Sequence, residues 1–112
     1  MELNTLEIEI LIDIYDSDML PEMAFEMANY KLKEEDLKDK KHEFASYLEN
    51  LKKFSYIKYD EKEAFSKCGI LSKKYNNDVT MICEDKIHID SKGIKLVEFF
   101  NLKTQSEMYR CG

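Results

Sequence analysis

The chain has 112 residues, 44% of them hydrophobic and 36% charged, which suits one domain with a single core and argues against a disordered chain. No apolar run approaches the roughly 20 residues of a membrane helix, and residues 1–10 carry acids where a secretory signal carries Lys or Arg. We therefore expect a cytoplasmic protein without membrane contact. Its net charge of −6 has the wrong sign for non-specific nucleic-acid binding, which depends on Lys and Arg.

The charge is unevenly distributed along the chain. Residues 1–36 hold eleven acidic and two basic residues, a balance of −9. Residues 37–112 hold twelve acidic and fifteen basic residues, a balance of +3. The acidic excess therefore belongs to the first third of the chain, and the remainder can still present a basic face.

The residue types that usually carry catalysis or bind metals show no informative spacing. Cys68, Cys83 and Cys111 are odd in number and form no CxxC pair, so neither a disulfide framework nor a zinc knuckle is indicated. A metal site from Cys68, Cys83 and His88 would match no standard zinc finger. The histidines are His42 and His88, which form no catalytic arrangement by spacing, and three glycines cannot form a phosphate-binding loop. We expect no enzymatic activity, no metal and no cofactor.

The first segment, residues 4–14, combines two patterns. Its Leu and Ile residues alternate with the period of a strand, but apolar residues also recur at helical spacing. Asn4 followed by Glu7 is typical of a helix start, and about eleven residues is long for a strand. We predict a helix that is buried on more than one side.

A short second helix is predicted over residues 21–30. Pro21 suits a first helical turn, because its missing N–H costs nothing there. Met19, Met23 and Met27 recur at a spacing of four. We interpret this Met stripe as gap-filling core packing, with an adaptable binding surface as the alternative.

The most regular amphipathic pattern predicts a third helix. It follows the charged stretch at residues 31–41, which we interpret as a loop or a solvated helical turn. Its apolar residues recur at helical spacing and are Phe44, Tyr47, Leu48, Leu51 and Phe54.

Beyond residue 55 the period changes to two, which predicts strands over residues 56–59 and 86–89. Asn76 and Asn77 indicate a turn, because Asn tolerates positive φ. This turn would join an arm at Ile70-Leu71 to an arm at residues 79–83.

Residues 60–75 leave two possibilities open, a short helix stopped by Gly69 or one arm of a long hairpin. The last helix is predicted to start at Asp90-Ser91, which are good N-cap residues. We expect a domain over residues 1–102 and a frayed tail over residues 103–112.

Two stretches resemble bacterial winged-helix proteins. The sequence YLENLKKFSYIKYD at residues 47–60 resembles a recognition helix running into the first wing strand, which in such families reads like LxxLxxxGYI. Ser55 stands here in place of the usual Gly. KIHIDSKGIKLVEFF at residues 86–100 is similar to the xLTxKGxxLLxxL ending of MarR-like and PadR-like regulators and of small phage winged-helix proteins, with Lys92-Gly93 as the Lys-Gly pair. Small DNA-binding proteins of conjugative plasmids are another similar group, and the segment between the outer wing strands is longer here than in a minimal wing.

The resemblance implies an α+β winged helix-turn-helix fold, with three helices followed by a β-hairpin wing and a C-terminal helix. It also implies a sequence-specific double-stranded DNA-binding protein that acts as a transcriptional regulator or as an accessory protein of a plasmid or phage. The third helix would lie in the major groove of double-stranded DNA, and the hairpin would follow the adjacent backbone. Asn50 is the best candidate for reading a base, because an Asn amide can form two hydrogen bonds with adenine. The residues expected to face solvent and contact DNA are Lys40, Lys41, His42, Ser46, Asn50, Lys53, Lys73, Lys74, Asn76 and Asn77.

The alternative function is an acidic protein-interaction module, such as a DNA mimic or an inhibitor of a host protein. The positions of the lysines decide between the two functions. Convergence of Lys40, Lys41, Lys73 and Lys74 on one face would favour DNA, whereas acids interleaved with them would favour a protein partner.

A homodimer is also expected, because one winged-helix module has a small footprint on DNA. The last helix carries more apolar surface than a short terminal helix needs. We expect the first and last helices to form the two-fold interface, with its apolar contacts from Leu96, Phe99, Phe100 and Leu102.

Overall fold

The computed structural model describes residues 3–20 and 22–110, with side chains up to residue 101. Helix α1 (Thr5–Met19) begins at the capping box indicated by the sequence. The side chain of Asn4 accepts the backbone N–H of Glu7 at 2.7 Å, and the Glu7 carboxylate accepts the N–H of Asn4 at 3.0 Å. The predicted helix is therefore confirmed.

The predicted helix over residues 21–30 is wrong. The described residues of this stretch are largely extended and contain one turn of 3-10 helix, η1 (Met27–Asn29). The buried ring of Phe25 stacks on Phe44 at 5.7 Å and meets Tyr30 edge-on at 6.1 Å, whereas its two sequence neighbours are exposed. An extended backbone sends successive side chains to opposite sides, so it can bury one aromatic ring without burying a helical stripe.

The Met stripe consequently does not form a core face. Met19 and Met23 are 48% and 46% exposed, so the core-packing interpretation is wrong for both. Met27 is partly buried against the core. Pro21, assigned above to a first helical turn, lies outside the described residues.

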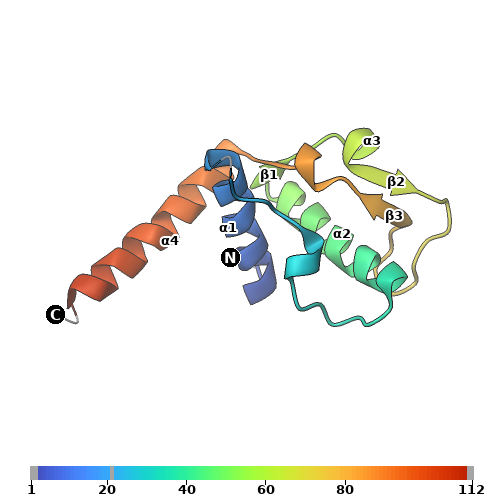
Figure 1. Ribbon diagram of the computed structural model, residues 1–112, viewed down its shortest axis with the longest axis horizontal. Coiled ribbons are helices and arrows are strands. Elements are labelled where there is room, and N and C mark those ends of the chain that lie inside the picture. Colours follow the sequence, from blue (N-terminus) through green and yellow to red (C-terminus); the bar gives the residue numbers. More distant parts are fainter. Residues whose placement is uncertain (1–2, 21, 111–112) are drawn as a thin grey trace.

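Helix α2 (Leu37–Lys53) confirms the third predicted helix and begins within the charged stretch that precedes the amphipathic pattern. The Asp36 side chain caps it by accepting the N–H groups of Lys38 and Asp39. α2 is the central element of the fold, with contacts to α1 and to strands β1 and β3 described below (Figure 1). The two helices that precede the first strand, rather than the expected three, correct the predicted element order.

Two small antiparallel sheets follow. Strand β1 (Ile57–Lys58) pairs with β4 (His88–Ile89), and β2 (Phe65–Lys67) pairs with β3 (Val79–Ile82) across an irregularity at Ser66-Lys67. The outer pair β1–β4 thus encloses the inner hairpin in the sequence.

Residues 60–75 contain a short helix and one arm of the long hairpin, but the helix ends at Ala64 and is not stopped by Gly69, as the first alternative had it. Helix α3 (Glu61–Ala64) leads directly into β2, one arm of the long hairpin. Asn76 has a φ of 54°, which confirms the turn signal. The predicted arm at Ile70-Leu71 is wrong, because both residues lie in the exposed loop beyond β2. The predicted strand over residues 86–89 shortens to β4, since a 3-10 turn, η2 (Glu84–Lys86), precedes it.

Helix α4 (Ser91–Arg110) starts where the sequence predicts. The Asp90 carboxylate accepts the N–H of Ser91, and its carbonyl accepts the N–H of Ile94. The first turns of α4 pack on α1, and its C-terminal half extends away from the rest of the fold (Figure 1). The domain limit at residue 102 and the frayed tail over residues 103–112 stay predictions.

The chain is therefore a compact α+β domain, and its described residues form four α-helices and two small two-stranded antiparallel sheets. Within the described ranges, no helix is long and apolar enough to cross a membrane.

Candidate functional site

The helix predicted to read DNA is largely enclosed. Between residues 42 and 51 of α2, the described side chains that reach solvent are those of Ser46, Glu49 and Asn50, each only in part. The other side chains of this stretch are buried, since α1 and the sheets pack around it. The central turns of α2 therefore present a narrow surface rather than an open polar face.

Two polar side chains on that narrow surface are already engaged. The amide nitrogen of Asn50 donates to the Glu7 carboxylate at 2.7 Å. The Ser46 hydroxyl donates to the backbone carbonyl of Glu43 at 2.6 Å. Because two-pronged adenine recognition needs the Asn amide as donor and acceptor, Asn50 would have to release Glu7 to read a base.

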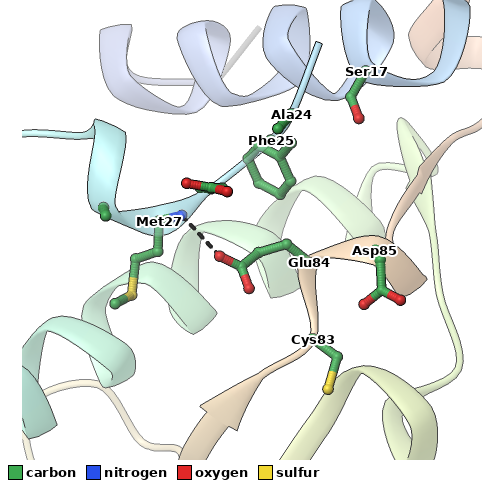
Figure 2. A pocket seen from close by; sticks show the side chains of 9 residues that line it. Ser17, Ala24, Phe25, Met27, Cys83, Glu84 and Asp85 are labelled. Carbon is green, nitrogen blue, oxygen red and sulfur yellow. Dashed lines mark hydrogen bonds between the residues drawn. The ribbon is translucent and has the colours of Figure 1, made fainter. Parts of the chain in front are cut away.

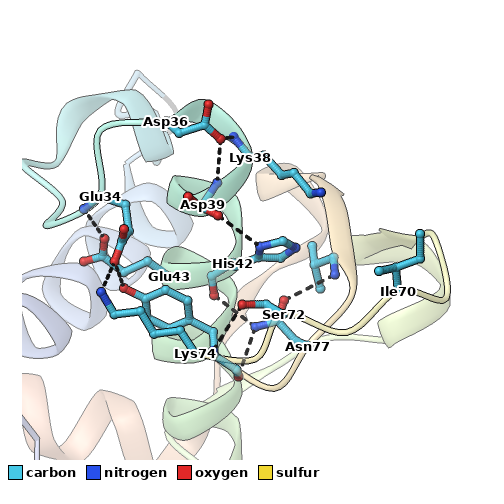
Figure 3. Close-up of polar contacts among 12 residues, drawn as sticks. Glu34, Asp36, Lys38, Asp39, His42, Glu43, Ile70, Ser72, Lys74 and Asn77 are labelled. Carbon is cyan, nitrogen blue, oxygen red and sulfur yellow. Dashed lines mark hydrogen bonds and ion pairs between the residues drawn. The ribbon is translucent and has the colours of Figure 1, made fainter.

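Two other predicted contact residues do not face solvent. His42 is 2% exposed and Asn77 is 5% exposed, so the expectation that they face solvent is wrong. The Asn77 amide donates to the His42 carbonyl at 3.0 Å, and its oxygen accepts the N–H of Val79 at 3.2 Å, so Asn77 fastens the hairpin loop to α2 (Figure 3). Neither ring nitrogen of His42 has a hydrogen-bond partner among the described residues, and Nδ1 lies 3.9 Å from the Asp39 carboxylate.

Lys74 is held by an acid from the first third of the chain. Its Nζ lies 2.6 Å from Oε2 of Glu34, which also accepts the Tyr75 hydroxyl (Figure 3). These hydrogen bonds, with that of Lys74 the stronger influence, hold the pKa of Glu34 below its ordinary value. The same pair raises the pKa of Lys74. Lys74 is thus one half of a surface ion pair, and its side chain is 69% exposed.

A buried carboxylate anchors the segment that carries Glu34. Glu43 is 0% exposed, and its oxygens accept the N–H groups of Lys33 and Glu34 at 3.0 and 2.9 Å and the Tyr47 hydroxyl at 2.5 Å. Sequence reasoning missed this role, because Glu43 looked like one more charge on a solvated face. Its position within the apolar stripe of α2, one residue before Phe44, was the available signal.

The predicted basic face is therefore interrupted by acids. Lys40 and Lys41 are partly buried, and Lys41 lines a small groove that also contains Glu84. Lys74 is bound to Glu34. The remaining predicted DNA-contact residues, which are exposed, are Lys53, Lys73 and Asn76.

A different surface lies at the C-terminal end of α1. A groove of about 490 Å³ separates residues 24–28 from residues 83–85, and we call it the acidic groove. Its lining contains the carboxylates of Glu26, Glu84 and Asp85, with the ring of Phe25 between the two walls (Figure 2). The Glu84 carboxylate accepts the N–H of Met27 at 3.0 Å and so joins the two walls.

Exposed apolar side chains lie in the chain segment that leads into this groove. Met19, Leu20 and Met23 are 45–48% exposed. In the last turn of α1, burial and repulsion from Asp13 raise the pKa of Asp16, which indicates crowded negative charge. This end of the molecule therefore combines apolar surface with a concentration of acids.

The predicted dimer residues occupy different environments. Leu96 is partly buried against the core of its own chain, whereas Phe99 is 58% exposed with its ring 6.1 Å from that of Phe100. The side chain of Leu102 lies outside the described ones.

In the part of the chain that the structure describes, no group of three or more His, Cys, Asp or Glu side chains is arranged so that it could hold a metal ion. Cys68 and Cys83 are exposed free thiols, and Cys111 lies outside the described residues. His88 instead pairs with Asp18, whose carboxylate also accepts the N–H of Ile89 at 2.6 Å.

Comparisons with protein-family models, with curated proteins and with solved structures find no match for this chain.

Proposed function

We propose that this domain binds another protein through the acidic groove and the exposed apolar side chains beside it. The carrying observation is the interleaving of acids with the lysines that DNA binding would need. Glu34 holds Lys74, Glu84 shares a groove with Lys41, and Asp39 lies within the first turn of α2. A carboxylate beside a lysine weakens its attraction for phosphate, which argues against a converged basic footprint.

The acidic groove supports a protein partner. Its lining holds three carboxylates and no Lys or Arg, and Met19, Leu20 and Met23 lie exposed in the segment next to it. Exposed apolar groups gathered with polar ones are typical of interaction sites, and Met side chains adapt to partners of different shape. This arrangement fits the acidic protein-interaction module, either as a DNA mimic or as an inhibitor of a host protein.

DNA binding is the second candidate. The exposed Lys53 and Lys73 favour it, as does the order of helix, strand, hairpin, strand and helix, which resembles a winged helix-turn-helix protein. In that function the loop after β2 would act as the wing, and Lys53 would contact phosphate from the end of α2. A homodimer through α4, with the exposed ring of Phe99 at its centre, is compatible with both candidates.

A mobility-shift assay separates the candidates. Random AT-rich duplex fragments are titrated with the chain at about 50 and 200 mM salt, and we expect no shift at either concentration. A shift that weakens steeply with salt and disappears in a folded Lys40→Ala/Lys41→Ala/Lys73→Ala/Lys74→Ala variant would reverse the order of the two candidates.

The protein-binding function needs a positive result as well. A protein that the wild-type chain captures from a cell extract is purified. Its affinity for the chain is then measured with the two purified proteins. We expect binding to the wild-type chain and to the quadruple lysine variant, since the lysines lie outside the acidic groove. If the partner binds variants of the acidic groove but does not bind the quadruple lysine variant, the acidic groove is not the binding surface.

A further inference from the structure

We propose that the acidic groove receives an extended peptide segment of the partner in which basic and apolar residues alternate. This inference rests on the proposed protein-binding function and specifies the chemistry of the partner. Three independent features of the groove carry it, namely its free backbone groups, its charge and its apolar lining.

The wall formed by residues 24–28 has an incompletely paired backbone. Glu26 has the φ and ψ of a strand, −139° and 135°. Alternate residues of extended backbone direct their N–H groups to the same edge, so the N–H of Phe25 shares an edge with the Met27 N–H that binds Glu84. The N–H of Phe25 donates to no acceptor among the described residues. Extended backbone with an unused donor can pair with an added strand, which would supply the missing carbonyl acceptor.

The charge of the groove selects a basic segment. Glu26 and Asp85 are exposed on opposite walls. One oxygen of the Glu84 carboxylate accepts the Met27 N–H, and its other oxygen has no partner among the described residues (Figure 2). An incoming Lys or Arg would therefore meet carboxylates on both sides, whereas an acidic segment would be repelled.

The apolar lining selects the alternate positions of the segment. Phe25 lies between the walls, and Met19, Leu20 and Met23 add exposed apolar surface in the adjoining segment (Figure 2). A strand sends successive side chains to opposite faces. One face of the added strand can therefore cover the apolar surface while the other places its cations beside the carboxylates, which defines the alternating pattern.

The test begins with selection of a phage-displayed library of random 12-residue peptides on the full-length chain. We expect enrichment of peptides in which Lys or Arg alternates with Val, Ile, Leu or Phe. The enriched peptide is then synthesised with a fluorophore, and its affinity is measured by anisotropy on three proteins with matched circular dichroism spectra. These are the wild-type chain, Glu26→Lys/Asp85→Lys, and the control Glu35→Lys/Glu98→Lys, which makes the same charge change at exposed positions outside the groove lining.

We expect affinity to fall about ten-fold or more in the groove variant and less than about two-fold in the control, since contact pairs outweigh screened long-range attraction. A peptide with Glu at each basic position should bind the groove variant better than it binds the wild-type chain. Upon binding, the amide proton of Phe25 should shift downfield in NMR spectra, as expected for a new hydrogen bond.

Several outcomes would overturn the inference. These are the absence of enrichment, enrichment of acidic or uncharged peptides, and equal losses of affinity in the groove variant and the control. If the purified partner binds both variants equally, the groove assignment fails while the protein-binding function stands. A salt-sensitive DNA shift would instead defeat the proposed function itself.

Discussion

Gly93 lies where α4 comes close to the backbone that precedes β1, and its substitution by Ala tests this packing. A Cβ added at this position would lie 2.1 Å from the carbonyl oxygen of Tyr56 and 2.8 Å from Cδ1 of Ile89. The same carbonyl accepts the N–H of Asp90 at 3.0 Å, which extends the pairing of β1 with β4. Because Gly93 has no side chain, α4 can pack closely against the β1–β4 pair.

The expected cost of the Ala substitution follows from this geometry. An ordinary carbon-to-oxygen contact is about 3.3 Å, so the Tyr56 carbonyl and α4 must separate by roughly 1 Å. Overpacking of this kind costs about 1–3 kcal/mol, and loss of the Asp90 hydrogen bond adds about 1 kcal/mol. Replacing Gly in a helix interior normally gains about 1 kcal/mol. We therefore expect Gly93→Ala to lower the free energy of unfolding by about 1–3 kcal/mol.

Urea denaturation followed by circular dichroism measures this change, with the exposed Lys95→Ala variant in the same helix as the control. The control should alter the free energy of unfolding by less than about 0.5 kcal/mol. A Gly93→Ala variant as stable as the wild-type chain, or stabilised by the usual helix preference, would refute the close approach. The sign of the change in the free energy of unfolding decides between these outcomes.

Three further predictions concern other parts of the molecule. His42→Met should raise the free energy of unfolding in urea by about 1 kcal/mol, because it removes a buried ring without hydrogen-bond partners; a destabilised variant would show that the ring has a role in folding. Phe99→Ser/Phe100→Ser should convert a dimer into a folded monomer on a sizing column, and a folded dimer that survived the change would exclude α4 as its interface. Hydrogen bonding from Lys74 lowers the pKa of Glu34, so this carboxylate should stay ionised as the pH falls through 4.5 and the contact should be lost only at more acidic pH. Carboxyl NMR of Glu34 checks this, and a midpoint at or above 4.5 would contradict it.

The helices that the sequence predicted correctly are those with local signals. α1 has a capping box formed within its own first turn, and α2 has an apolar stripe. Both signals depend on residues a few positions apart, so they can be recognised without knowledge of the fold. The turn at Asn76 also has a local signal, since a positive φ is a property of one residue.

The errors arose where distant partners determine the local structure. Residues 21–30 have helical spacing of their Met side chains, but Phe25 is buried against Phe44 from α2 and holds the segment extended. The hairpin arm lies at β2 rather than at Ile70, because β2 pairs with β3. In this pairing Ser66 is the partner of Met81, and the Thr80 hydroxyl donates to the Ser66 carbonyl. Propensity alone cannot identify such partners.

The candidate site also combines features that the sequence predicts with features that depend on distant partners. The charge balance of the first third could be read from the sequence, but the use of each acid could not. Glu7 and Glu43 are buried and satisfied by hydrogen bonds, and Glu34 is paired with Lys74. These acids support the fold and contribute little to recognition.

The acids that remain available for recognition are therefore fewer than the sequence suggests, and their positions matter more than their number. Glu26 comes from the acidic first third, whereas Glu84 and Asp85 come from the part of the chain with a positive balance. The hydrogen bond from Met27 N–H to Glu84 brings the two parts together across the groove. A surface assembled from the first third and from the remainder of the chain cannot be found by summing charge along the sequence. For this reason, reversal of Glu26 and Asp85 together tests the groove as a unit, which a change confined to the first third would leave half intact.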